Sequence, residues 1–103
     1  MDKYQPHYPL RQLQTLVQQL GSSAFTVTAI RGGAAMGLTV GEMLMVIAAL
    51  NRTNFYKSMT TYADHRVWQD VYHADIPQLR KTAYIKMTLH DGSPVIQFKE
   101  KQP

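Results

Sequence analysis

Apolar residues recur at helical spacing between residues 9 and 21, in the segment PLRQLQTLVQQLG. Their positions, three or four residues apart, fall on one face of a helix: Leu10, Leu13, Leu16, Val17 and Leu20. Pro9 suits the first position of a helix, and Gly21 suits the position just after the last turn. The pattern therefore predicts an amphipathic helix that begins at Pro9 and ends before Gly21.

The period of the apolar positions changes after this helix. In FTVTAI, the apolar residues Phe25, Val27 and Ala29 alternate with threonines, as they would in a short strand. The segment RGGAAMG interrupts that alternation at Gly32 and Gly33. The pattern predicts a short strand followed by a segment of undecided structure.

A second helix is predicted from Thr39 onward. Thr39 and Glu42 have the spacing of a capping box, in which each side chain accepts a hydrogen bond from the other residue's backbone N–H. The apolar run MLMVIAAL follows and ends at Leu50. Its methionines are interpreted as core residues rather than as a ligand surface.

The end of the chain has the two-residue period of β-strands. AYIKMTLH and PVIQFKE flank the dipeptide Asp91-Gly92, which is a preferred two-residue type I′ hairpin turn. A turn of this type fixes which residues of the two strands face each other. The predicted pairs are His90 with Ser93, Met87 with Ile96, Lys86 with Gln97, Ile85 with Phe98, and Tyr84 with Lys99.

This hairpin has one apolar face and one polar face. The apolar face carries Ile85, Met87, Leu89, Ile96 and Phe98, and the polar face carries Tyr84, Lys86, Gln97 and Lys99. Because the helices precede the strands along the chain, an α+β fold is predicted, with an antiparallel sheet and helices packed on one face. The polar face would then stay uncovered. Residues 1–103 are expected to form a single domain.

RVWQDVYH, residues 66–73, predicts a further strand. Its alternation puts Trp68 and Tyr72 on one face and Gln69 and Val71 on the other. The pattern does not decide which of these faces meets the core.

Composition and charge limit the kinds of site, partner and location that can be expected. The chain has no cysteine, which excludes a disulfide framework, a thiolate zinc site and a cysteine nucleophile, and which fits the cytoplasm as the expected location. The formal net charge of +4 favours a polyanion or an acidic protein as partner. No apolar run approaches the roughly 20 residues of a spanning helix, so no membrane association is expected.

Metal and cofactor chemistry find no support in the motifs. The four histidines, His7, His65, His73 and His90, match no metal-binding spacing. The chain contains no G-x-S-x-G, Walker A or G-x-G-x-x-G motif. We therefore expect no bound metal and no cofactor.

The uncovered polar face is the remaining candidate site. Lysine, tyrosine and glutamine on a basic sheet can hold a phosphate, donate protons and stack on bases. The stretch FYKSMTTYADHRVWQDVYHAD, residues 55–75, adds more side chains of the same kinds. The same residues would also suit an ordinary solvated face of an antiparallel sheet, and the pattern alone leaves both interpretations open.

Three segments of the chain resemble the MqsR family of bacterial toxins, the motility and quorum-sensing regulators: FYKSMTTY, the WQDVY that follows, and the final FKEK. The resemblance extends to the YIKMT strand, the first helix and the Pro6-His7 dipeptide. It implies a fold similar to the RelE-type ribonuclease toxins and cleavage of messenger RNA, notably at GCU-like sites, with arrest of translation and growth under stress. It also implies a cognate MqsA-like antitoxin, through which alone the protein would contact DNA.

The resemblance also implies site residues. The family's functional lysine, glutamine and tyrosine fall on Lys57, Gln69 and Tyr84, and a lysine near the C-terminus falls on Lys99. In the implied reaction, the RNA 2′-hydroxyl attacks the adjacent 3′-phosphate and leaves a cyclic phosphate and a 5′-hydroxyl. The two lysines would stabilise charge, Tyr84 would act as acid or base, and Gln69 would orient the phosphate or a base edge.

Further RNA contacts are expected from Tyr56 and Tyr62, which would stack on bases, and from Lys86 and Gln97 on the polar face. The chain departs from the family pattern at His73, where arginine is expected after the tyrosine. Two alternative functions use the same features: a non-catalytic RNA-binding or transcription-regulating module, and an interaction domain that docks a partner protein.

Overall fold

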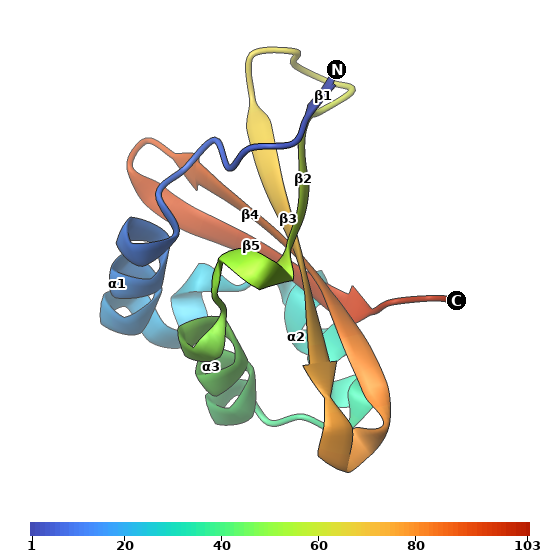
Figure 1. Ribbon diagram of the computed structural model, residues 1–103. Helices are drawn as coiled ribbons and strands as arrows, with labels where there is room; N and C mark the ends of the chain where they lie inside the picture. The colour runs from blue at the N-terminus through green and yellow to red at the C-terminus, as the bar shows by residue number, and fades with distance from the viewer.

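The computed structural model describes residues 1–103 and contains five antiparallel strands in the order β1-β2-β3-β4-β5, with three α-helices (Figure 1). The strands are β1 Asp2–Lys3, β2 Phe55–Thr60, β3 Trp68–Ile76, β4 Lys81–His90 and β5 Ser93–Glu100. The helices are α1 Leu10–Leu20, α2 Val27–Met36 and α3 Val40–Ala49, with short 3-10 turns η1 Gly21–Ala24, η2 Arg52–Asn54 and η3 Pro77–Leu79. The α+β prediction, with the helices gathered on one side of the sheet, is confirmed (Figure 1).

The predicted first helix is present, one residue shorter at its start. Pro9 has ψ 122° and precedes the helix, so α1 begins at Leu10 rather than at Pro9. Gly21 ends the helix with φ 64°, a left-handed value that glycine adopts without strain. Leu13 and Val17 of the predicted apolar stripe are buried in the core.

The prediction of a strand over residues 25–30 is wrong, because α2 begins inside this segment. The Thr26 hydroxyl accepts a hydrogen bond from the backbone N–H of Ala29 at 3.0 Å, and so caps a helix that runs through the two glycines. Phe25 alone keeps a strand-like contact, a parallel bridge to Ile96 of β5. In this segment the first of the two threonines is therefore the cap of a helix, and the alternation of threonines with apolar residues does not indicate a strand.

The two glycines of α2 are explained by close packing. A Cβ atom at Gly32 would collide with the backbone carbonyl oxygen of Phe98, and one at Gly33 would collide with the side chain of Met43. The absence of side chains lets α2 lie directly against β5 on one side and against α3 on the other. This contact also covers the outer edge of β5.

The predicted cap of α3 and the predicted hairpin register are both confirmed. Thr39 and Glu42 exchange the two hydrogen bonds of a capping box, at 2.9 and 3.1 Å. All five predicted pairs between β4 and β5 occur in the sheet. Asp91 and Gly92 have φ values of 50° and 77°, as a type I′ turn requires.

The core lies between the helices and one face of the sheet. Alternate residues of the strands enter it, including Tyr72, Ala74, Ile85, Met87, Ile96 and Phe98. In β3 the core face is therefore the one that carries Trp68 and Tyr72, and Gln69 and Val71 belong to the opposite face. We call this opposite side, which no helix covers, the open face.

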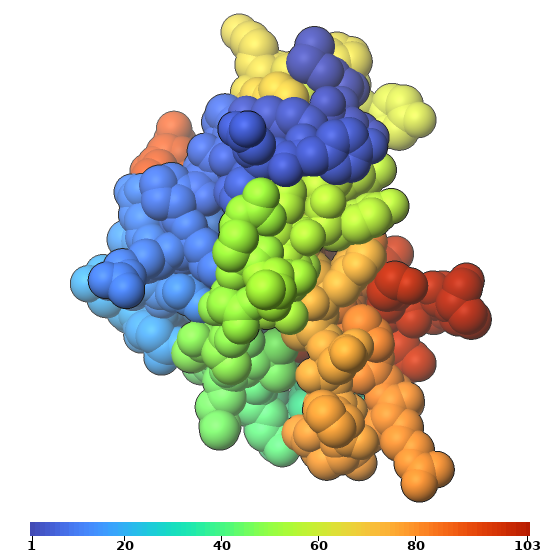
Figure 2. Space-filling view, viewed as in Figure 1, coloured from blue at the N-terminus to red at the C-terminus, as the bar shows by residue number.

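The N-terminal segment is attached to the sheet at its β2 side, and Figure 2 shows it lying across the surface there. Asp70, a fully buried carboxylate of β3, accepts hydrogen bonds from the backbone N–H groups of His7 and Tyr8, at 3.0 and 2.9 Å. The Ser58 hydroxyl donates a third hydrogen bond to it at 2.6 Å. These bonds fix the chain between β1 and α1.

No single helix is long and apolar enough to cross a membrane. α2 and α3 reach that length and composition only as a pair bent by 93°.

Candidate functional site

Polar side chains cross the open face in three rows, each defined by residues that pair between neighbouring strands. Because successive rows are two residues apart along a strand, they lie roughly 7 Å from each other. The first row is His73, Tyr84 and Lys99; the second is Lys57, Val71, Lys86 and Gln97; the third is Met59 and Gln69. Three of the four residues implied to be functional occupy the first two rows, and Gln69 occupies the third.

The first row is a contiguous group of rings and one ammonium. The Nζ atom of Lys99 lies 5.4 Å from the centre of the Tyr84 ring. The rings of Tyr84 and His73 are 5.5 Å apart, and Tyr56 stacks on His73 at 4.5 Å. Tyr56 reaches this row because β2 has a bulge between Phe55 and Lys57, which leaves Tyr56 as the extra residue.

A groove of about 670 Å³ lies over this row. Figure 2 shows the C-terminal residues, in red, standing out from the surface beside the orange segment that contains β3 and the start of β4. The groove is lined by Tyr56, His73, Tyr84, Lys99, Lys101 and Gln102. With two lysines and no acidic residue in its lining, the groove suits an anion.

Lys57, in the second row, is held by the N-terminal strand. Its Nζ atom donates a hydrogen bond to Oδ2 of Asp2 at 3.2 Å. This bond raises the pKa of Lys57 above its ordinary value. The lysine is therefore a proton donor or a charge stabiliser near neutral pH, rather than a base.

Burial shifts the pKa values of two other residues of the open face in opposite directions. It raises the pKa of Tyr84, an effect that the charge of Lys57 opposes only in part. Burial and the charge of Lys99 lower the pKa of Lys86. Tyr84 consequently keeps its proton near neutral pH and can donate it.

Gln69 reaches the open face by simple alternation. The bulge of the sheet is in β2, and β3 needs none, because the face that Gln69 shares with Val71 is the open one. Val71 is buried between Lys57 and Lys86 of its own row. Gln69 is four positions before His73 along β3, so the third row lies roughly 13 Å along the strand from the first.

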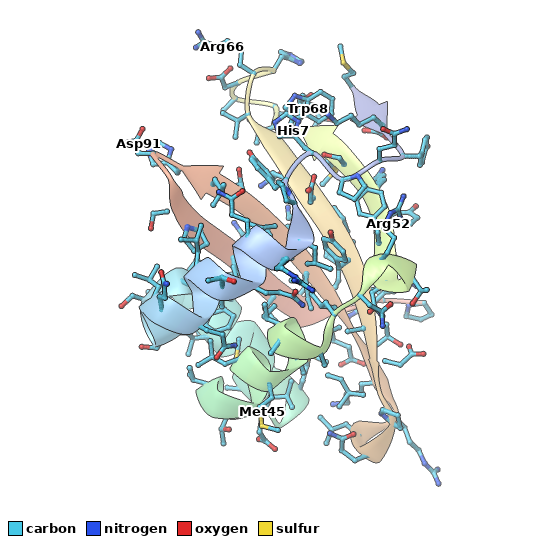
Figure 3. All side chains as sticks on the ribbon, turned by 60° about the vertical axis from the view of Figure 1, so that its left-hand side comes forward. His7, Met45, Arg52, Arg66, Trp68 and Asp91 are labelled. Carbon is cyan, nitrogen blue, oxygen red and sulfur yellow. The ribbon has the colours of Figure 1, made fainter.

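Two aromatic residues lie away from the rows. Tyr62 is fully exposed in the loop between β2 and β3, beyond the third row, and does not line the groove. Trp68 is on the opposite side of the sheet, where the His7 ring stacks on it at 5.4 Å (Figure 3). Lys3 Nζ lies 4.3 Å from the centre of the Trp68 ring.

Three residues of the site were missed by sequence reasoning: Asp2, His73 as part of the first row, and Lys101. Alternation along β3 could have found His73, because it lies two residues from Val71 and four from Gln69. The position of Asp2 beside Lys57 has no local signal, since the two residues meet only through strand pairing of the distant N-terminus.

No group of three or more histidine, aspartate and glutamate side chains is placed to hold a metal ion. A second cavity, of about 300 Å³, lies between α3 and the end of β3 and includes the exposed Met45 (Figure 3). Its lining contains no lysine, tyrosine or histidine, so it shares no chemistry with the groove.

Comparison with known proteins identifies the family of this chain. Residues 5–100 match the family model described as motility quorum-sensing regulator, toxin of MqsA. The chain belongs to this family. The resemblance inferred from FYKSMTTY, WQDVY and FKEK is thereby confirmed over nearly the whole chain.

A relative from Escherichia coli (strain K12), the mRNA interferase toxin MqsR, is 39% identical over 101 residues, which cover 98% of this chain and all of the relative. In this chain one uncovered face of the sheet carries Lys57, Gln69, Tyr84 and Lys99. Their roles are taken up as a proposal below.

Proposed function

We propose that this MqsR-family chain is an endoribonuclease that cleaves messenger RNA, and that its catalytic site is the first two rows of the open face. The observation that carries the proposal is the direct pairing of Tyr84 with Lys99 beside a groove lined by cationic and aromatic side chains. The mRNA interferase activity named for the E. coli relative supports it. Such an enzyme would act in the cytoplasm, where its substrate is translated.

The proposed reaction uses the RNA's own 2′-hydroxyl as nucleophile on the adjacent 3′-phosphate. Charge accumulates on the phosphate oxygens in the transition state, and Lys57 and Lys99 supply ammonium groups to stabilise it. The 2′-hydroxyl releases its proton to water as it attacks. Tyr84, which keeps its proton near neutral pH, donates it to the leaving 5′-oxygen and regains a proton from water afterwards. The products are a 2′,3′-cyclic phosphate and a 5′-hydroxyl.

Gln69 is assigned to positioning of the RNA. From the third row it lies too far along β3 to share one phosphate with Tyr84. Its amide can instead hold a neighbouring phosphate or a base edge, and so align the chain across the rows. Lys86 and Gln97, in the second row, would contact the RNA between the first row and the third. Tyr56 would stack on a base.

Incubation of the purified protein with RNA in excess EDTA tests the proposal. We expect cleavage to persist in the chelator and the new fragments to carry cyclic-phosphate and 5′-hydroxyl ends. GCU-like sites are expected to be enriched among the cuts. Binding of RNA without any cleavage would instead favour the non-catalytic RNA-binding module, and activity that returns only with added Mg²⁺ or Zn²⁺ would overturn the proposed chemistry.

A partner protein completes the proposed function. The family description names MqsA as the partner of these toxins. We expect an antitoxin of that kind, encoded alongside, to bind this chain tightly, to suppress its RNA cleavage and to provide its only contact with DNA. Undiminished cleavage by the purified complex would contradict this part of the proposal, as would unimpaired growth of cells that produce the chain alone.

A further inference from the structure

His73 lines the groove and has no role in the reaction described above. Its side chain is held between two rings from neighbouring strands. Tyr56 of β2 stacks on it with ring centres 4.5 Å apart and planes at 24°, and Tyr84 of β4 lies 5.5 Å away with planes at 38°. These contacts fix the imidazole in one orientation within the groove lining.

The hydrogen-bonding capacity of this imidazole is unused. Its Nε2 atom is buried and has no hydrogen-bond partner. Since Nε2 is enclosed by protein, Nδ1 is the nitrogen that can meet a ligand in the groove.

The charges that face His73 are mostly positive. Lys99 and Lys101, from β5 and the residues after it, line the same groove, and Lys57 of β2 follows Tyr56. Two acids on this face are already engaged: the Asp75 carboxylate accepts a hydrogen bond from the Thr82 hydroxyl at 2.8 Å, and the Asp2 carboxylate accepts one from Lys57 at 3.2 Å. Burial, together with the charge of Lys101, lowers the pKa of His73. The imidazole of the free protein is therefore neutral at pH 7.

We propose that His73 is a phosphate-binding residue of this groove and that it takes up a proton when RNA binds. A phosphate beside Lys101 would offset the repulsion that, together with burial, lowers the pKa of His73, and it would accept a hydrogen bond from Nδ1–H. The bound state therefore favours imidazolium. The proposal rests on RNA being the ligand, as proposed above, and adds a residue and a proton to its recognition.

The direction of the pH effect follows from linkage. If RNA binds the protonated form more tightly, the pKa of His73 is higher in the complex than in the free protein, and binding consumes a proton between these two values. Affinity then rises as the pH falls through that window. It levels off at lower pH, where His73 is already protonated before RNA arrives.

The test uses an RNA that the enzyme cannot cut, so that binding is measured apart from cleavage. The probe is a short, fully 2′-O-methylated RNA containing GCU, which lacks the nucleophilic hydroxyl. Its dissociation constant is measured from pH 5.5 to 8.5 at constant ionic strength, for the wild type, His73→Arg, His73→Gln and the control His90→Gln. His90 is exposed at the β4–β5 turn, outside the groove.

We expect the wild type and His90→Gln to bind about tenfold more tightly at the acidic end than at the alkaline end, because each pKa unit gained on binding corresponds to a tenfold change in affinity. His73→Arg, with a permanent charge, should bind tightly with little pH dependence. His73→Gln should bind weakly at every pH. The same pH dependence in all four proteins would overturn the proposal, and so would an absence of binding at every pH.

A measurement on the wild type alone avoids any variant that folds poorly. The His73 imidazole is titrated by NMR with and without the methylated RNA, and calorimetry in two buffers of different ionisation enthalpy counts the protons taken up at pH 7. An unchanged His73 titration on binding would overturn the proposal. Proton-linked binding by a protein that cuts no ordinary RNA would leave the role of His73 intact and overturn the endoribonuclease proposal instead.

Discussion

Tyr84 and Lys99 face each other directly across the β4–β5 hairpin, with Lys99 Nζ 5.4 Å from the centre of the Tyr84 ring. The Asp91-Gly92 turn fixes this pairing, and a slip of one residue would turn apolar side chains of the hairpin, such as Ile85 and Phe98, out of the core. Core packing thus fixes the relative position of two groups that lie on the opposite side of the sheet. A phosphate bound between them would contact both.

We therefore predict that Tyr84→Phe and Lys99→Ala each lower the rate of RNA cleavage by roughly 10²-fold or more, the scale for loss of a positioned proton donor or charge stabiliser. The double variant should be much less impaired than the product of the two single effects, because both residues act on one transition state. The test is to measure single-turnover cleavage rates of the folded single and double variants and of the wild type.

Lys81→Ala provides the matched control for this pair. Lys81 is also a lysine of the β4–β5 sheet, but it pairs with Glu100 at 3.8 Å and lies outside the groove lining. Its loss should leave cleavage close to wild type. Near-normal rates in Tyr84→Phe and Lys99→Ala would remove the pair from the catalytic site.

Asp2 is predicted to restrain Lys57. RNA must compete with the Asp2 carboxylate for the Lys57 ammonium, which is bonded to it at 3.2 Å. Exposed ion pairs are worth about 0.2–1 kcal/mol, so Asp2→Asn should tighten RNA binding by roughly 1.5- to 5-fold. The binding should also become more sensitive to salt, since one more phosphate contact forms freely. Weaker binding by Asp2→Asn would show that Asp2 instead holds Lys57 in its productive position.

The same contact has a defined effect on stability. Because Asp2 raises the pKa of Lys57, the pair stabilises the fold while Lys57 is charged, at neutral pH and up to its ordinary pKa. The contribution is lost as the pH rises through the higher pKa of the folded state. Urea unfolding at several pH values should show wild type and Asp2→Asn converging in the alkaline range.

The sequence predicted the hairpin well and α2 poorly, for one physical reason. A two-residue turn and an alternating pattern are local, and they determine β4 and β5 without reference to the rest of the chain. The structure of residues 25–37 depends on contacts with distant partners, because Gly32 and Gly33 are needed only where α2 meets β5 and Met43 of α3. Glycine weakens an isolated helix, so the pattern alone argued against one.

The residues of the candidate site also fall into two groups: those that local sequence could place and those that depend on distant contacts. Tyr84, Lys86, Gln97 and Lys99 could be placed on one face from the turn alone, and all four lie there. Gln69 could not be placed, because its strand has apolar residues on both faces and only the packing of Tyr72 against the helices decides between them. The position of Tyr56 depends on a β-bulge, and no feature of the sequence predicts that bulge.

Gly32 is predicted to be essential for the position of β5. A Cβ at residue 32 would overlap the Phe98 carbonyl oxygen and lie 3.2 Å from Lys99 Cα. Gly32→Ala should therefore destabilise the fold by roughly 1–3 kcal/mol, the usual cost of overpacking, and should reduce cleavage by displacing Lys99. Gly41→Ala is the control, because the nearest atom to its new Cβ is 3.9 Å away, and it should stabilise α3 by up to about 1 kcal/mol. Thermal unfolding of both variants tests this, and equal stability of the two would contradict the packing argument.

Asp70 is predicted to be the main attachment point of the N-terminal segment. Its carboxylate is fully buried and satisfies the N–H groups of His7 and Tyr8 and the hydroxyl of Ser58. Asp70→Ala would leave these donors without a partner, and we expect a loss of roughly 2–4 kcal/mol in the free energy of unfolding, measured by urea titration. Asp75→Ala, which removes an exposed carboxylate of the same strand, should cost less than about 1 kcal/mol. If Asp70→Ala proved as mild as Asp75→Ala, the N-terminal segment would have to be held by β1 pairing and by the stacking of His7 on Trp68 instead.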